Sequence, residues 1–285
     1  MTSRQWYTKG KVITLNNFQV FFNREGRGEP LFCIHGFPSS SWDFAEVWPA
    51  LKAHFDLIAH DLIGLGKSSK PNTALTVSLQ ADVVEALALR LGIKRAHILA
   101  HDLGNTVAQE LLARQLSKSS KIEWLSCIFM NGGIFAETHR PLLVQKLLLS
   151  KLGPLFVKFM FKHTFTSNLT KVFSEAHPPS QVYLDTTWQL TSANNGLSMI
   201  PRLIHYMKER QVFRDRWVNP LVQNIIPLRL INGIEDPISG QHLADHYAKL
   251  IPNADIVLLQ HTGHYPHIEQ PHKVVQAVLE FHKTL

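Results

Sequence analysis

A sharp turn is predicted within Ile98-Leu99-Ala100-His101-Asp102-Leu103-Gly104-Asn105. The apolar run at 96–100 predicts a short strand, and the pattern at 107–114 predicts a helix. Small residues stand two positions before and after Asp102, where larger side chains would collide across a strand-to-helix turn. Such a turn exposes the central side chain beside the positive end of the helix, so Asp102 is a candidate nucleophile. Taken alone, an aspartate here is more often only the N-cap of the helix.

Strands and helices alternate outward from this turn in both directions. Toward the N-terminus we expect a hairpin over 11–22 with an Asn16-Asn17 turn, strands at 31–34 and 57–59, and helices at 42–54 and 78–91. Toward the C-terminus we expect strands at 124–130, 227–232 and 256–259, and helices at 242–250 and 272–281. The alternation predicts a mostly parallel sheet with the active residues at the carboxyl ends of the strands.

The alternation stops between residues 134 and 220, where the sequence is mostly helical and is interrupted by prolines. We therefore expect an α/β core made of 1–133 and 221–285, with a helical cap, 134–220, inserted between its two parts.

Composition narrows the class of protein. The chain has 285 residues, of which 45% are apolar and 18% charged, so a sizeable core can form. Its net charge is +7, but the sequence contains no run of basic residues of the kind typical of nucleic-acid binding. We therefore expect no nucleic-acid partner. The polar N-terminus lacks the apolar core of a signal peptide, and no uncharged apolar run is long enough to span a membrane.

Cysteine and histidine usage bears on compartment and metal binding. Cys33 and Cys127 each lie in an apolar, strand-like run, which predicts two buried reduced thiols and a cytoplasmic protein. The sixteen histidines form no HExxH motif and no pairing with cysteine. We therefore expect no metal and no cofactor.

Four candidate motifs follow predicted strands. In chain order they are His35-Gly36-Phe37-Pro38, Asp102, Asp236-Pro237 and Gly263-His264. They are accompanied by Asp61-x-x-Gly-x-Gly-x-Ser68. The order nucleophile, acid, histidine is typical of α/β-hydrolases. Individually, Asp236 could be only a turn residue and His264 only a surface histidine.

With these motifs the chain resembles the α/β-hydrolases that use an aspartate nucleophile, namely the epoxide hydrolases and haloalkane dehalogenases. Segments 131–143 and 213–217, together with 107–112 and 263–271, resemble the mesoderm-specific transcript family. The resemblance covers nearly the whole chain. It implies an α/β-hydrolase fold with an eight-stranded, mostly parallel sheet and an inserted helical cap.

A carboxylate nucleophile determines the chemistry that is expected. Attack by Asp102 on an alkyl carbon gives an ester that water can hydrolyse, with His264 as general base and Asp236 orienting it. The oxyanion would form on the Asp102 carboxyl group, and the backbone N–H groups of Phe37 and Leu103 are its expected donors. Asn131, where some relatives place the acid, cannot carry charge.

The residues around the nucleophile indicate which leaving group the enzyme could accept. Haloalkane dehalogenases hold halide with donors at the positions of Phe37 and Leu103, whose side chains here cannot donate. Epoxide hydrolases protonate the opening oxide with two cap tyrosines, for which Tyr206 and Tyr183 are the candidates. Tyr206 could instead be an aromatic packed under the cap, and no tyrosine lies in 140–165, where the first would be expected.

We therefore expect an epoxide hydrolase-like enzyme acting on a small apolar substrate. Haloalkane dehalogenase or esterase/lipase-like activity, and a non-catalytic ligand-binding scaffold, remain alternatives. The predicted pocket lining is His35, Phe37, Leu103, Phe135, Trp188 and Tyr206.

The cap also suggests weak contact with a membrane. From 134 to 220 there are 11 Lys/Arg and 5 Asp/Glu. Lys158 and Lys162 are four residues apart and would share a helix face, opposite Phe156, Phe159 and Met160. A basic and apolar helix suits an anionic bilayer, although the apolar face could simply close over the active site.

Overall fold

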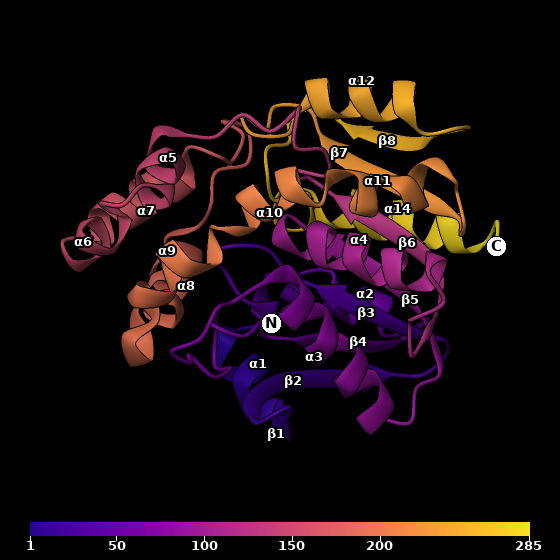
Figure 1. The fold of residues 1–285 in the computed structure, drawn as a ribbon, viewed down its shortest axis with the longest axis horizontal. Helices are drawn as coiled ribbons and strands as arrows, with labels where there is room; N and C mark the ends of the chain where they lie inside the picture. Colours follow the sequence, from indigo (N-terminus) through magenta and orange to yellow (C-terminus); the bar gives the residue numbers. More distant parts are fainter.

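Eight strands form the centre of the structure, a computed structural model that describes residues 1–285 (Figure 1). They are β1 (Lys11–Leu15), β2 (Phe18–Gly26), β3 (Pro30–Ile34), β4 (Asp56–His60), β5 (Arg95–His101), β6 (Glu123–Met130), β7 (Leu228–Gly233) and β8 (Asp255–Leu259). Their order is β1-β2-β4-β3-β5-β6-β7-β8. Strand β2 is antiparallel to both neighbours and the other pairs are parallel, which confirms the predicted sheet.

The central strands are apolar because helices cover both of their faces. Leu31–Ile34 of β3 and Ala96–His101 of β5 are buried throughout. Cys33 and Cys127 are buried and unpaired, as predicted. The parallel strands all point their carboxyl ends to the same edge, and the candidate motifs follow there.

Helices from the first and last parts of the chain surround this sheet. The core helices are α1 (Ser3–Lys9), α2 (Trp48–Leu51), α3 (Val77–Arg90), α4 (Leu103–Leu116), α12 (Gln241–Leu250), α13 (Pro266–Glu269) and α14 (Pro271–His282). Helices α3 and α11 (Arg214–Val222) pack against opposite sides of α4. Glu110 of α4 accepts a hydrogen bond from the Trp217 indole at 2.8 Å, which fixes α11 on the core.

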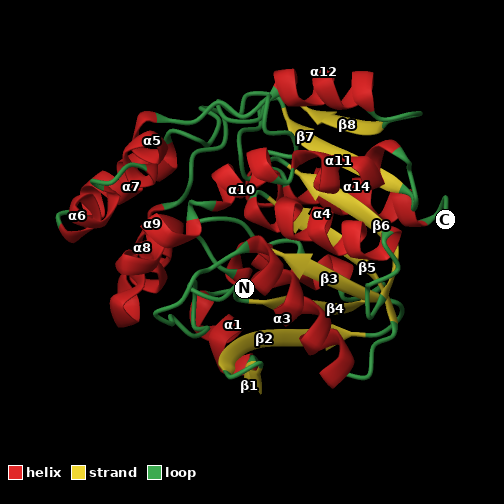
Figure 2. Ribbon diagram, in the orientation of Figure 1, coloured by secondary structure: helices red, strands yellow, loops and turns green.

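Between β6 and β7 the chain forms helices and adds no strand to the sheet (Figure 2). These are α5 (Leu143–Leu149), α6 (Gly153–Lys158), α7 (Lys162–Thr170), α8 (Gln181–Ser192), the 3-10 helix η2 (Ala193–Met199), α9 (Ile200–Leu203), α10 (Tyr206–Val212) and α11. Helices α5 to α9 stand beside the carboxyl edge of the sheet (Figure 1). The division at 134 and 220 stays a prediction; helix α11, inside the predicted cap, packs on the core helix α4.

Two local expectations were wrong, and one helix was missed. The helix expected over 42–54 is a 3-10 turn, η1 (Ser41–Ala45), followed by the short α2, because Pro49 lacks the N–H that a continuing helix requires. Helix α1, which was not predicted, begins with a capping box formed by Thr2 and Gln5. Lys158 ends α6 and Lys162 begins α7, so these lysines do not share one helix face.

No helix in the structure combines the length and the apolar character needed to cross a bilayer.

The turn at Asp102 is tight and strained. Its backbone lies at φ 48° and ψ −110°, a conformation that non-glycine residues rarely adopt. A Cβ at Gly104 would lie 2.2 Å from the carbonyl oxygen of Ile34, and a Cβ at Gly132 would lie 2.3 Å from the Asp102 Cα. Glycine is thus required at both positions because backbone approaches from two neighbouring strands.

Gly104→Ala should therefore destabilise the protein by about 3 kcal/mol, because the clash is with backbone that cannot rotate away. Gly92→Ala is the control, since Gly92 also has positive φ but no atom within 4 Å of the added Cβ, and it should cost only about 1 kcal/mol. Urea unfolding of both variants measures the difference. Equal losses would contradict the close-approach explanation.

Candidate active site

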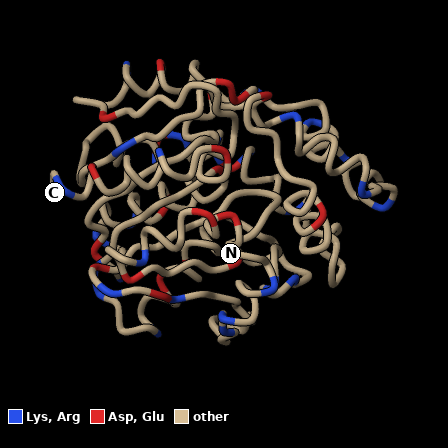
Figure 3. Tube along the Cα trace, turned by 180° about the vertical axis from the view of Figure 1, so that it is seen from behind, with Lys and Arg blue, Asp and Glu red and all other residues tan.

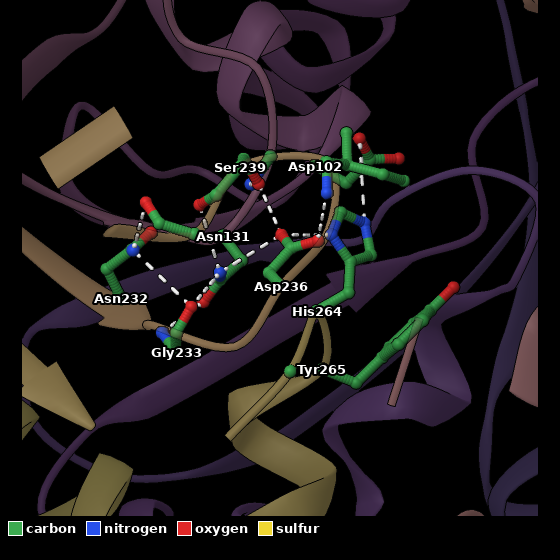
Figure 4. A network of polar contacts seen from close by, with 12 residues as sticks. Asp102, Asn131, Asn232, Gly233, Asp236, Ser239, His264 and Tyr265 are labelled. Carbon is green, nitrogen blue, oxygen red and sulfur yellow. Dashed lines mark hydrogen bonds and ion pairs between the residues drawn. The ribbon is translucent and has the colours of Figure 1, made fainter. Parts of the chain in front are cut away.

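Asp102, Asp236 and His264 meet at the carboxyl edge of the sheet (Figure 4). Asp102 lies between β5 and α4, Asp236 follows β7, and His264 follows β8. The Nδ1 of His264 donates to Asp236 Oδ2 at 2.7 Å, and its Nε2 lies 3.9 Å from Asp102 Oδ1. The structure therefore brings together the three side chains that the motifs singled out.

Asp236 is buried and surrounded by donors. Asn131 donates to its Oδ2 at 3.1 Å, the Ser239 hydroxyl donates to the same oxygen, and the Ile238 N–H donates to Oδ1 at 2.8 Å. Burial would raise the pKa of Asp236, but the charge of His264 and these hydrogen bonds together lower it to about 2. The carboxylate is therefore ionised at every physiological pH.

His264 is held through its backbone as well as its ring. Its N–H donates to Val172 O at 2.8 Å, and its carbonyl accepts from His101 Nε2 at 2.7 Å. Burial would lower the pKa of His264, but the hydrogen bond and charge of Asp236, and the charge of Asp102, raise it to about 9. Asp236 thus keeps a proton on Nδ1, and Nε2 faces Asp102.

The two oxygens of the Asp102 carboxylate have different surroundings. Oδ2 accepts a hydrogen bond from the Phe37 N–H at 2.9 Å, whereas Oδ1 lies 3.5 Å from the Tyr206 hydroxyl. Leu103 is the first residue of α4, where a backbone N–H has no acceptor within the helix. Of the two predicted oxyanion donors, the Phe37 N–H contacts this carboxyl group, and the role of the Leu103 N–H stays a prediction.

A cavity of about 90 Å³ opens onto Asp102 and His264. Most of its wall is apolar and comes from the helical segment between β6 and β7, in which Gln145, Thr164 and Asn168 are the polar exceptions. The lining residues are Phe37, Pro38, Asp102, Leu142, Val144, Gln145, Leu148, Met160, Thr164, Phe165, Asn168, Leu169, Val172, Ile200, Ile238, His264 and Tyr265. Such a wall suits a small apolar ligand.

Several predicted pocket residues lie elsewhere. His35 is buried beneath the site, where its Nε2 accepts from the Leu62 N–H at 2.9 Å. Leu103 is buried at the start of α4, and Phe135 packs against His246 and Tyr247. Trp188 packs at a tilt against the lining residue Phe165, with the ring centres 5.4 Å apart. The sequence could not distinguish these residues from the true lining residues. Proximity in sequence to the site does not show whether a side chain points into the cavity or away from it.

The two candidate tyrosines separate clearly. The hydroxyl of Tyr183 donates to Asp43 at 3.0 Å and its ring stacks on Trp42, so it does not face Asp102. Tyr206 is buried, does not line the cavity, and presents its hydroxyl to Asp102. Burial, followed by the negative charge of Asp102, raises the pKa of Tyr206, so its phenol stays protonated.

Sequence analysis missed three residues of the site. Tyr265 lines the cavity beside His264, and Glu269 accepts hydrogen bonds from the backbone of Gly263 and Tyr265, which flank His264. Arg210 is buried with its guanidinium 5.0 Å from the ring centre of Tyr206. The four-residue spacing of Tyr206 and Arg210 on one helix was the available signal.

One group of side chains has ligand types and spacing compatible with a metal ion. Asp43, His101 and His267 are buried, with donor atoms within 4.8 Å of one another. Asp43 already accepts hydrogen bonds from Ser39 and Tyr183, and His101 Nε2 already binds the His264 carbonyl. The group therefore offers an incomplete ligand set, and the expectation of no metal stays a prediction.

Comparison with known proteins agrees with this architecture. A model of the "Alpha/beta hydrolase family" matches residues 31–277. The mesoderm-specific transcript homolog protein of Bos taurus is 37% identical over 289 aligned positions, covering 97% of this chain and 86% of that protein. The putative hydrolase LipZ of Mycobacterium tuberculosis is 32% identical, covering 97% of this chain and 96% of that protein.

Solved structures share the fold. The haloalkane dehalogenase DatA from Agrobacterium tumefaciens C58 has a TM-score of 0.82 at 20% identity, with 97% of each chain covered. The epoxide hydrolase CorEH has a TM-score of 0.73 at 19% identity, with 95% of this chain and 97% of that chain covered. At these identities the likeness concerns the fold alone.

The chain belongs to the alpha/beta hydrolase family, and the predicted fold is confirmed. It is homologous to the mesoderm-specific transcript proteins over most of its length, which confirms the second resemblance. In the structure, two of the resembling segments contact each other, since Arg214 donates to Glu137 at 3.1 Å.

The raised pKa of His264 predicts a pH-dependent stability. Native His264 keeps its proton up to about pH 9, whereas an unfolded histidine loses it near about 6.5. The stabilisation is therefore complete below about pH 6.5 and is lost as the pH rises through about 9, an effect of about 3 kcal/mol. Urea unfolding of wild type and His264→Gln from pH 6 to 10 should show this loss only in wild type.

The same substitution at the exposed His163 is the control and should keep the wild-type slope. Parallel pH profiles for wild type and His264→Gln would contradict the ion pair with Asp236.

Proposed function

We propose that this protein hydrolyses an apolar alkyl electrophile through a covalent ester on Asp102. The observation that carries the proposal is the Asp102 carboxylate itself. It borders the apolar cavity, with Oδ2 bound by the Phe37 N–H and Oδ1 opposite His264 Nε2. Membership of the hydrolase family supports hydrolysis in general; the aspartate nucleophile and the substrate are the proposed parts.

In the first step, an Asp102 oxygen attacks a substrate carbon and the bond from that carbon to the leaving oxygen breaks. The 3.9 Å between His264 Nε2 and Asp102 Oδ1 is too long for a hydrogen bond. A serine nucleophile would need that bond to lose its proton, but a carboxylate is already ionised. The separation therefore suits an aspartate nucleophile that needs no base.

In the second step, His264 takes a proton from a water that attacks the carboxyl carbon of the ester. The tetrahedral oxyanion is stabilised by the N–H groups of Phe37 and Leu103, and its collapse returns the Asp102 carboxylate and releases the alcohol. Formation of the ester removes the negative charge of Asp102, which is one cause of the raised pKa of His264. Loss of that charge lowers the pKa of His264, so a larger fraction of the ring is neutral and able to accept a proton once the ester exists.

An epoxide is the substrate class favoured by Tyr206. Its hydroxyl lies 3.5 Å from Asp102 Oδ1, close to where an attacked carbon and its departing oxygen would sit. The phenol can donate its proton to that oxygen, and the nearby Arg210 guanidinium favours the phenolate that results. Phe37 and Leu103 offer no side-chain donor for a halide, which disfavours dehalogenation.

His264→Gln should trap the ester, because it removes the base of the second step and leaves the nucleophile intact. Incubation with a panel of apolar epoxides, haloalkanes and carboxylate esters, followed by peptide mass spectrometry, should show an alkyl adduct on Asp102 with an epoxide. Asp102→Ala should form no adduct and lose turnover.

Wild-type turnover by His264→Gln would contradict the assignment of the base. An adduct from haloalkanes alone would replace the epoxide by a halide substrate. No adduct and no turnover with any member of the panel would favour a ligand-binding scaffold.

Tyr206→Phe should slow adduct formation by about 10²-fold or more, because the leaving oxygen loses its acid. Tyr183→Phe is the matched control, since Tyr183 is also buried but hydrogen-bonds Asp43. Stopped-flow measurement of the first step in both variants distinguishes them. Equal rates in Tyr206→Phe and wild type would exclude Tyr206 as the acid.

A further inference from the structure

The outer side of helices α5 to α7 exposes large apolar side chains. Of the twelve large hydrophobic residues exposed in the whole chain, five lie between 143 and 161, with exposed fractions from 54% to 83%. They are Leu143, Leu152, Leu155, Phe159 and Phe161. Scattered apolar residues are ordinary on protein surfaces, but such a concentration in neighbouring short helices indicates a binding surface.

The charges on the same segment have one sign. Residues 138–174 contain six Lys/Arg and no Asp or Glu. All five lysines are exposed: Lys146, Lys151, Lys158, Lys162 and Lys171. Only Lys162 has an acidic partner, Asp185 of α8, at 2.9 Å. Basic residues mark this end of the molecule in Figure 3.

The inner side of these helices forms the roof of the cavity. Leu142, Val144 and Leu148 line it from the α5 region, and Phe165 and Leu169 line it from α7. Met160 also faces inward, whereas its neighbours Phe159 and Phe161 point outward. Helices α5 to α7 therefore lie between the exposed apolar surface and the cavity above Asp102.

We propose that the outer surface of α5–α7 docks onto an anionic lipid bilayer. The exposed leucines and phenylalanines would enter the boundary between headgroups and acyl chains, and the lysines would contact the anionic headgroups. A bilayer fits this surface because residues 138–174 expose lysines and large apolar side chains and contain no acid. Apart from Lys162, these lysines have no acidic partner within the chain, so an anionic partner would complement them. A second part of the proposal rests on the proposed function. Because the roof of the cavity would lie against the bilayer, an apolar substrate would pass from the lipid through this roof to Asp102.

Co-sedimentation of the full chain with vesicles tests the docking. Vesicles of phosphatidylcholine that contain about 30 mol% phosphatidylglycerol should bind the protein at least tenfold better than vesicles of pure phosphatidylcholine. Added salt should weaken this binding. The variant Lys151→Glu/Lys158→Glu should lose at least tenfold in binding. Phe159→Ser/Phe161→Ser should also lose binding, although its charge is unchanged.

Matched variants control for charge and for exposed apolar area in general. Lys94→Glu/Lys118→Glu changes two exposed lysines remote from the cap, and Val12→Ser/Leu258→Ser changes exposed residues on the edge strands. Both should bind as wild type does. Equal binding to the two vesicle types, no binding, or equal losses in the control variants would overturn the proposal.

His264→Gln keeps the whole surface and should bind vesicles as wild type does. Its binding therefore separates the docking proposal from the proposed chemistry, which can fail while docking stands.

Discussion

The backbone of Asp102 is the constraint on which the site depends. At φ 48° the chain turns directly from β5 into α4, and the carboxylate is left at the carboxyl edge of the sheet. This turn requires backbone contact from both sides, from Ile34 against Gly104 and from Gly132 against the Asp102 Cα. The two neighbouring strands, β3 and β6, supply these contacts, so the strain at one residue is balanced by pairing across the centre of the sheet.

The same edge explains how charge is tolerated in a buried site. Asp236, His264 and Asp102 are all nearly inaccessible to water, and each would be costly alone. Asn131 and Ser239 provide polar partners for Asp236, while the Phe37 N–H serves Asp102. Because these donors come from loops after three different strands, β3, β6 and β7, the network forms only when the sheet is complete. The polar site and the apolar core are therefore parts of one cooperative structure.

Segments after β6 connect the core to the cap. Gln109 of α4 donates to the carbonyl of Ile134 at 3.0 Å, and Val172 of the cap accepts the backbone N–H of His264. Glu269 extends this link by accepting from the Ser174 N–H at 2.9 Å as well as from the two residues beside His264. The helical segment between β6 and β7 thus contributes to the placement of His264 as well as to the lining of the cavity.

The sequence by itself determined the sheet, the helical segment after β6 and the order of Asp102, Asp236 and His264. Local periodicity specifies strands and helices, and strand ends of a parallel sheet lie on one edge, so residues that follow them can be expected to meet. Only the tertiary structure decided which tyrosine faces Asp102 and which cap side chains line the cavity. Tyr183 and Tyr206 are both buried aromatics on cap helices, and only their packing against Asp43 or Asp102 separates them. The same holds for Met160 and its exposed neighbour Phe159, because burial depends on contacts between elements distant in sequence, which local pattern does not contain.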